Sequence, residues 1–541
     1  MNKIIVKNQR LKWLFGGLGF HNSEATMTAL MNDSFKNERV LKTFNEISPT
    51  FSRVFAGYSN WTKEAMDSFA DFYDATFRKA GTLLYLVPGR MPHITDDFNM
   101  EEYCEKVAVN LEYLIKVRKC TKIRYYCVTN ELSVGNTYAF LASDLPLLKK
   151  LHECLYKAFR RHELDIGLLA TDCSGTENFG QIDWARKNMD EVTECYCAHL
   201  YSEYLPGDLG AYDYYINSFT PPVLTAHSAE KRFVLGEFGL AQVKRFEKYP
   251  MRNDVSVAVD NPEMEKLWAI AICEMAMAAI NSGCFSAAFW TLFDYPDPFI
   301  RENGDTPEEK ARYDAARFSG HGLDVRYNKH GIIRWSDIED DYSSRAALYS
   351  VGYMAKFFKK GSRVLECDWQ DEFIRCCGVA NEDGSVSVAI INWDDNEKKN
   401  ILETEKSINK PMRRYEYSAD NVPFNKFNDL HSFADVVDMS GQRVEITLKP
   451  KSVTFLTTDY LDRTPSKIKN IVIKNDTLCW DECKDSEHCY YRVFASNKKD
   501  FEPTLENQIA STIATSLSER VSGTLITISG LTFTFSVNST K

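Results

Sequence analysis

The sequence lacks any run of 18 apolar residues among its 541 positions. A membrane-spanning helix needs about 20 such residues, so we expect none here. The first residues, Met1 to Lys7, are basic but contain no long apolar core, which is not the pattern of a signal peptide. Both absences predict a cytoplasmic protein that has no membrane partner.

The chain also lacks an excess of positive charge. Its formal net charge is −11 and no basic stripe occurs, which argues against nucleic acid as a partner. Gly16, Gly17 and Gly19 do not form a nucleotide-binding loop, because the G-x-G-x-x-G spacing and a following acidic strand end are missing. These absences leave a globular protein with some other class of ligand.

A disulfide framework and a standard metal motif are missing as well. The 15 cysteines are an odd number, and several, such as Cys127, lie inside apolar patterns. This favours reduced, buried thiols in a cytoplasm. In the tail, Cys479, Cys483, His488 and Cys489 fit no standard zinc-ligand spacing. We expect neither a metal nor an organic cofactor.

What is present is an alternation of short apolar runs and helical patterns over residues 12–293. The expected strands are residues 13–18, 50–55, 82–87, 123–128, 166–171, 194–201, 233–239 and 285–292. A polar insertion and a last helical pattern over residues 342–359 follow. Eight continuous apolar strands separated by helices predict a (β/α)8 TIM barrel of the α/β class.

The remaining chain has a different period. From about residue 362 the apolar residues alternate, which predicts a β-sandwich packed on the barrel. The composition changes again at Pro465, and the tail reads as a second, smaller β-sandwich that folds separately. We therefore predict a catalytic barrel over 1–360, a β-sandwich over 361–463 and a C-terminal β-sandwich over 464–541.

Two of the expected barrel strands end in a glutamate. Glu131 follows the run 123–128, and Glu237 follows the run 233–236. A carboxyl group at the end of a buried strand is unfavourable unless it is paired or used. Because active sites of such barrels lie at the C-terminal strand ends, these two groups are candidates for a proton donor and a nucleophile. The plain alternative is two ordinary solvated strand ends.

These residues resemble the large clan of retaining glycoside hydrolases that carry catalytic glutamates on strands four and seven of a (β/α)8 barrel. The matching positions are Asn130-Glu131 for the acid/base motif, Glu237 for the nucleophile motif, His199 and Tyr201 on strand six, Arg53 on strand two and Trp290 on strand eight. The sandwich resembles the domain appended in xylosidase- and glucosylceramidase-like families, and the tail resembles a fibronectin type III module.

The resemblance implies a chemical role for both glutamates. Glu131 would protonate the leaving oxygen and would need a raised pKa. Glu237 would attack the anomeric carbon and would need to stay ionised, which Arg53 favours. A structural ion pair low in the barrel is the alternative role for Arg53.

The other matching residues would bind or position the substrate. Asn130 would hydrogen-bond the sugar 2-hydroxyl, and Tyr201 would hold Glu237. Trp290 would form a floor beneath the sugar, and His199 would orient a carboxylate or bind a hydroxyl. A turn role is the alternative for Asn130, and a place in the core is the alternative for Trp290. For His199 a place in the core is an equally weighted alternative.

Weaker candidates lie in the expected loops. His21 follows strand one, residues 90–93 follow strand three, and Asp294, Asp297 and Trp335 lie in the insertion. Each is a candidate for substrate contact and also a plausible ordinary loop residue.

The expected activity is that of a retaining β-glycosidase acting on oligosaccharides or small glycosides. A transglycosylase would use the same residues, and a non-catalytic carbohydrate-binding protein is the alternative from another class. The sequence leaves a homo-oligomer open and does not identify the sugar.

Overall fold

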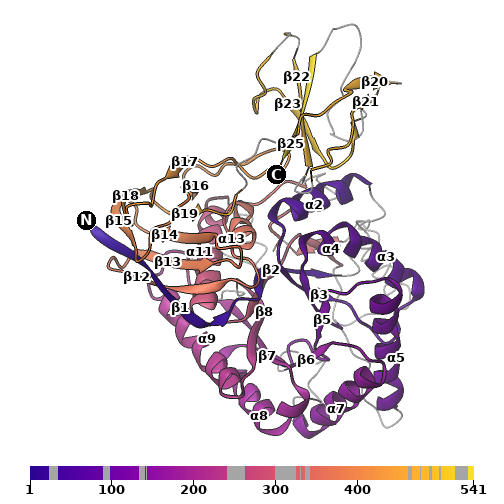
Figure 1. Ribbon diagram of the computed structural model, residues 1–541. Coiled ribbons are helices and arrows are strands. Elements are labelled where there is room, and N and C mark those ends of the chain that lie inside the picture. The colour runs from indigo at the N-terminus through magenta and orange to yellow at the C-terminus, as the bar shows by residue number, and fades with distance from the viewer. Residues whose placement is uncertain are drawn as a thin grey trace.

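The computed structural model describes the chain except residues 24–33, 89–97, 133–140, 142, 241–261, 299–324, 329–330, 335–341, 461–465, 475–476, 486–489, 497, 499–500, 518–533 and 541. Figure 1 shows a barrel ringed by helices, a β-sandwich beside it and a small tail domain above helix α2. Among the described helices, none is long and apolar enough to cross a bilayer.

Eight parallel strands close the barrel in chain order. They are β2 (Gly17–Ser23), β3 (Phe51–Phe55), β4 (Leu83–Val87), β5 (Ile123–Tyr126), β6 (Gly167–Ser174), β7 (Cys195–Ser202), β8 (Arg232–Leu240) and β9 (Ser286–Phe289). Apolar side chains such as Phe51, Leu169 and Val234 fill the interior below the mouth. The predicted TIM barrel followed by a β-sandwich is therefore confirmed.

Helices cover the outside of the barrel and bury their apolar faces against the strands. They are α2 (Ser34–Ile47), α3 (Lys63–Ala75), α4 (Phe77–Ala80), α5 (Met100–Glu112), α7 (Leu145–Arg161), α8 (Gly180–Asn188), α9 (Ala211–Ser228), α11 (Pro262–Asn281) and α13 (Val351–Phe357). A π-helical turn, η1 (Tyr113–Val117), extends α5, and 3₁₀ turns occur at η2 (Thr176–Asn178), η3 (Asp190–Val192) and η4 (Ala346–Tyr349). Strands β10 (Tyr295–Pro298) and β11 (Val325–Asn328) pair beyond the eighth barrel strand.

The expected single helix over 342–359 is wrong. It is divided into η4 and α13 at Ser350, whose backbone lies outside the helical region (φ −123°, ψ −82°). The buried Ser350 hydroxyl donates to the Ala269 carbonyl of α11 at 2.7 Å. This contact with a helix distant in sequence accompanies a break that local periodicity does not reveal.

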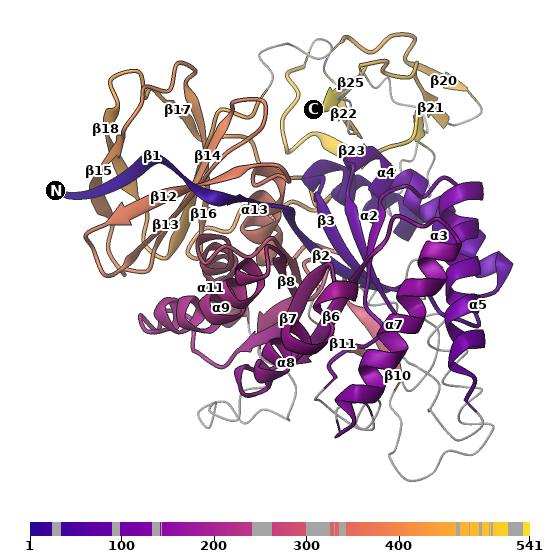
Figure 2. The ribbon, with the colours of Figure 1, turned by 60° about the horizontal axis from the view of Figure 1, so that its bottom comes forward.

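The first strand of the chain does not belong to the barrel. Strand β1 (Asn2–Leu14) pairs antiparallel with β12 (Arg363–Trp369) and parallel with β15 (Lys398–Thr404). The first barrel strand begins at Gly17, so the expected strand over 13–18 was misplaced. Figure 2 shows β1 running along the sandwich before the chain enters the barrel.

A nine-stranded sheet forms the sandwich, in the order β17-β16-β19-β14-β13-β12-β1-β15-β18. The strands not yet given are β13 (Ile374–Ala380), β14 (Val386–Asn392), β16 (Met412–Ser418), β17 (Asp435–Val437), β18 (Arg443–Leu448) and β19 (Ser452–Thr457). Its interior is apolar, and its other face continues the core of the barrel helices. Buried Arg375 also donates to Glu274 of α11 at 3.1 Å, which fixes the sandwich on the barrel.

The tail forms two small sheets around its own core, which includes Trp480 and Val493. The strands are β20 (Val472–Lys474), β21 (Thr477–Cys479), β22 (Tyr490–Ser496), β23 (Gln508–Thr512), β24 (Ser516–Leu517) and β25 (Thr534–Thr540). Tyr490 donates to Glu46 of α2 at 2.7 Å, so the tail contacts the barrel directly.

Candidate active site

Three acidic residues meet at the C-terminal ends of the barrel strands. Glu237 lies within β8, and Glu131 follows β5 in a short loop. The loop is tied to β6 by a hydrogen bond from the Thr129 hydroxyl to the Thr171 carbonyl at 2.9 Å. The third acid, Asp172, lies in β6 and is fully buried. Glu131 and Asp172 have positive φ angles of 49° and 59°, which non-glycine residues rarely adopt.

Arg53 holds these acids together from β3. Its buried guanidinium donates to Glu237 Oε1 at 2.5 Å, to Asp172 Oδ2 at 2.8 Å and to Asn130 Oδ1 at 2.6 Å. A guanidinium is always charged and presents several donors in a fixed plane, which suits this bridging position. The arrangement brings strand ends β3, β6 and β8 into one charged centre.

Asp172 was not predicted from the sequence. Besides Arg53 it accepts hydrogen bonds from Tyr85 Oη at 2.7 Å and from His199 Nε2 at 2.9 Å. The sequence contains a pattern that could have identified it: Asp172 directly follows the apolar run 166–171, as the two glutamates follow their apolar runs. Burial opposes its ionisation, but the charges of His199 and Arg53 prevail and hold its pKa below the ordinary value.

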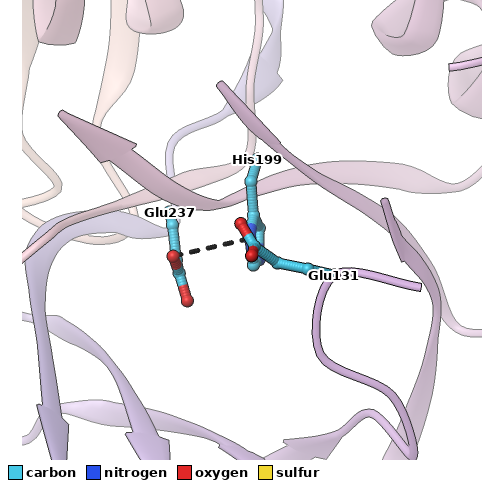
Figure 3. Close-up of side chains that lie close together, drawn as sticks. All are labelled: Glu131, His199 and Glu237. Carbon is cyan, nitrogen blue, oxygen red and sulfur yellow. Dashed lines mark hydrogen bonds and ion pairs between the residues drawn. The ribbon is translucent and has the colours of Figure 1, made fainter. Parts of the chain in front are cut away.

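His199 and Tyr201 extend from β7 toward the two glutamates. His199 Nδ1 lies 3.3 Å from Glu131 Oε1 and 3.5 Å from Glu237 Oε2. Figure 3 shows the three side chains converging on one point. Tyr201 Oη donates to Glu237 Oε2. Both carboxylate oxygens of Glu237 therefore accept a hydrogen bond. The Glu131 side chain is less enclosed, with a relative solvent exposure of 26%.

His21 and Trp290 form the aromatic side of the site. Their rings stack with centroids 4.1 Å apart and planes 25° from parallel, and Phe55 packs against both. His21 is buried within β2, whereas Trp290 is partly exposed. Because His21 Nδ1 lies 3.1 Å from the Arg53 guanidinium, which can only donate, the nitrogen accepts and the ring is neutral. His21 thus supports Trp290 and Arg53 from within the barrel, not from a loop.

The pKa values of the two glutamates run opposite to the sequence-based expectation. Burial raises the pKa of Glu237, although His199 and Arg53 oppose this. Burial also acts on Glu131, but the hydrogen bond and charge of His199 outweigh it and lower the pKa of Glu131. The difference arises because His199 approaches both carboxyls, and its pKa is raised to about 10 by Asp172 and Glu237 against the effect of burial.

The other sequence candidates have different positions. Asp294 is buried and accepts from Arg345 at 2.6 and 2.7 Å and from the Gly331 amide at 2.8 Å, so its side chain anchors the insertion. Residues 90–93, Trp335, His488 and Cys489 lie outside the described residues, as does the side chain of Asp297.

One group of side chains has metal-ligating geometry among the residues described. Glu131, His199 and Glu237 each offer one ligand atom, and these atoms lie within 4.8 Å of one another. A metal would need the His199 nitrogen unprotonated, whereas its raised pKa favours the imidazolium at neutral pH. The group therefore suits proton and carboxylate chemistry better than metal binding.

Neither the protein-family models nor the curated protein sequences yield a match to this chain. Solved structures do. The glycoside hydrolase family 30 subfamily 8 xylanase from Clostridium acetobutylicum is 13% identical with a TM-score of 0.52, covering 84% of this chain and 99% of its own. An endo-β1,6-glucanase is 14% identical with a TM-score of 0.52, covering 84% and 93%. The α-L-arabinofuranosidase from Thermotoga maritima is 11% identical with a TM-score of 0.56, covering 85% and 100%. At these sequence identities the structural similarity shows that this chain shares their fold.

Proposed function

We propose that the protein is a retaining glycoside hydrolase that cleaves β-glycosidic bonds of oligosaccharides or small glycosides. The observation that carries this is the pair Glu131 and Glu237, whose facing oxygens lie within 4.8 Å at the mouth of the barrel. Retaining enzymes hold their two carboxyl groups about 5–5.5 Å apart, whereas inverting enzymes leave about 6.5–9.5 Å for a water molecule. The close pair supports double displacement through a glycosyl-enzyme.

In the proposed first step Glu237 attacks the anomeric carbon. Its two oxygens are oriented by Arg53 and Tyr201, which restricts the carboxylate to one approach. Glu131, the more exposed acid, protonates the leaving oxygen. In the second step Glu131 removes a proton from water, which attacks the same carbon and releases Glu237.

Asn130 and Trp290 would bind the sugar itself. The Asn130 carbonyl oxygen accepts from Arg53, which leaves the amide nitrogen to donate to the sugar 2-hydroxyl. Trp290 offers one partly exposed ring, and His21 stacks with it at 4.1 Å. A rigid aromatic surface suits the apolar face of a pyranose.

The structural neighbours support a carbohydrate substrate, because their names are xylanase, glucanase and arabinofuranosidase. The glucanase is named for a β-linkage and the arabinofuranosidase for an α-L linkage. A panel of test substrates for this protein should therefore contain both β-linked and α-L-linked glycosides. The fourteen described cysteines are all free thiols, which supports a reducing compartment such as the cytoplasm.

A screen of aryl glycosides against the purified protein tests the proposal. We expect turnover of at least one β-glycoside and none by Glu237→Ala. Activity that survives in that variant would contradict the assignment of the nucleophile. Adding a sugar acceptor and analysing the products distinguishes hydrolysis from transglycosylation, which uses the same residues.

A further inference from the structure

Both ring nitrogens of His199 face carboxyl groups. Nε2 lies 2.9 Å from Asp172 Oδ1, while Nδ1 lies 3.3 Å from Glu131 Oε1 and 3.5 Å from Glu237 Oε2. The ring is fully buried. An ionised carboxylate can only accept a hydrogen bond, so each close contact requires a proton on the nitrogen or on the oxygen.

Counting protons at these contacts identifies one that can move. The Nε2 proton is held by Asp172, which also binds permanently charged Arg53. Without a proton between Nδ1 and Glu131, a nitrogen lone pair would face two carboxylate oxygens, which is repulsive in a buried site. One proton therefore occupies the contact between His199 Nδ1 and Glu131 Oε1 at neutral pH.

The surrounding charges decide where this proton rests. The groups that face His199 are Asp172 of β6, Glu131 after β5, Glu237 of β8, Arg53 of β3, Tyr85 of β4 through Asp172, and Tyr201 and His21 at the edges. Of the acids, Asp172 is the most buried, and its charge raises the pKa of His199 to about 10. The pKa of Glu131 is lowered. Both directions place the proton on His199 in the free protein.

We propose that His199 stores the catalytic proton and passes it from Nδ1 to Glu131 when a sugar occupies the site, with Asp172 as the positioning residue. This inference rests on the proposed glycosidase function. A bound sugar removes water from the partly exposed Glu131 side chain, which favours a neutral pair over an ion pair. Positive charge developing at the anomeric carbon favours proton transfer in the same direction.

The steps balance over one turnover. His199 gives its Nδ1 proton to Glu131, and Glu131 gives it to the leaving oxygen as the glycosidic bond breaks and Glu237 bonds to the anomeric carbon. Water then attacks that carbon, the bond to Glu237 breaks, and the water proton goes to Glu131. Glu131 returns the proton to His199, so the site recovers its starting state.

His199→Asn tests the storage role, because the amide can still donate toward Glu131 but does not titrate. For substrates with poor leaving groups we expect kcat/KM at pH 7 to fall about 100-fold or more, a typical size for acid catalysis. The basic limb of the pH profile should also move to lower pH by about one unit or more, since Glu131 would hold its proton without help. Substrates with good leaving groups should lose less than about tenfold.

His162→Asn is the matched control. His162 also lies between two carboxylates, Glu105 at 2.6 Å and Glu112 at 2.8 Å, but on the helices outside the barrel. The same substitution there should leave the pH profile unchanged. A basic limb that stays in place in His199→Asn, or equal losses on both substrate types, would overturn the relay.

A readout without turnover separates this inference from the proposed function. In ¹⁵N-histidine-labelled protein, both nitrogens of His199, assigned through His199→Asn, should be protonated at pH 8. In Glu131→Gln the Nδ1 proton should be lost at lower pH. Finding Nδ1 unprotonated at pH 7 in the wild type overturns the inference. A protonated His199 in a protein that cleaves no glycoside would contradict the proposed function alone.

Discussion

Two of the charge clusters among the described residues differ in their balance of acidic and basic groups. The active-site cluster sets three acids, Glu131, Asp172 and Glu237, against Arg53 and the titratable His199. The junction cluster joins α2, the loop before β17 and the tail. It sets two acids, Glu46 and Asp429, against two basic residues, Lys42 and Arg492.

Within the junction cluster, Asp429 is the most fully hydrogen-bonded acid. Asp429 accepts from Lys42 at 2.6 Å, Arg492 at 3.0 Å, Gln508 at 2.9 Å and Ser511 at 2.8 Å. Its side chain has no exposure, whereas the Glu131 side chain retains 26%. Buried acids that are fully paired with basic groups hold segments of the chain together. Acids that outnumber the basic groups and lie beside solvent are better suited to acid/base and nucleophilic catalysis. We therefore expect charge balance to distinguish the structural cluster from the proposed active site.

The largest expected effect comes from removing the proposed nucleophile. Glu237→Ala should lower kcat by about 10⁴-fold or more, because no other group in the cluster can form the glycosyl-enzyme. Asp429→Asn, an acid of the junction cluster, should leave kcat near the wild-type value at 25 °C. Similar losses in both variants, measured on one aryl glycoside, would remove the distinction between the clusters.

Removing the proposed proton donor should have a smaller, substrate-dependent effect. Glu131→Ala should lower kcat/KM about 10²–10⁴-fold for substrates with poor leaving groups and much less for good ones, which need little protonation. A series of aryl glycosides of graded leaving-group acidity measures this. Equal losses across the series would count against Glu131 as the donor.

Breaking the junction cluster should affect stability instead. Asp429→Ala leaves the buried Lys42 and the partly buried Arg492 without their shared acid, so the free energy of unfolding should fall by roughly 3–5 kcal/mol. Thermal or urea denaturation measures this, with Asp435→Ala of the exposed strand β17 as the control.

Truncation after residue 463 extends the same test to the tail. It removes Tyr490, Arg492 and Gln508, so it should lower stability while activity on small glycosides stays near normal. A folded but inactive truncation, or one of unchanged stability, would contradict this account.

The smallest expected effects are those of pH on stability. They should have opposite directions for the two clusters. The folded pKa of His199 is raised to about 10, so its stabilisation is complete below about pH 6.5 and is lost as pH rises toward 10. Burial opposes ionisation of Asp429, but Lys42 and Arg492 lower its pKa, so its stabilisation is complete above about pH 4 and is lost below.

Melting temperatures across pH measure the two windows. The difference in melting temperature between the wild type and His199→Asn should become smaller as the pH rises from 6 to 10. The difference between wild type and Asp429→Asn should narrow as pH falls below about 4. Differences that stay constant with pH would mean that lost packing, not charge, explains both.

The sequence predicted the parts of this structure that depend on local pattern. Strands β3 at 51–55 and β4 at 83–87 follow their expected ranges closely, because short continuous apolar runs are typical of buried strands. Strand β1 was not predicted, and the expected strand over 13–18 was misplaced, because the partners of β1, β12 and β15, lie more than 300 residues away. Pairing over that distance leaves no local signal.

The site followed the same division. Glu131, Glu237 and Arg53 could be named because each stands in an apolar strand or at its end. Asp172 carried the same signal and was missed. The pKa order of the glutamates could not be predicted, because it depends on where the His199 ring lies between them. The pKa values depend on side-chain distances of about 4 Å or less between groups on different strands. These distances are determined by the whole barrel and not by any one segment of the sequence.

The central claim is that Glu131 and Glu237 perform double displacement, and the configuration of the first product tests it most directly. Proton NMR of the sugar released early from a β-glycoside should show the β anomer first, with the α anomer appearing later by mutarotation. An initial α anomer would contradict the mechanism, because it requires direct attack by water in a site whose facing oxygens lie within 4.8 Å.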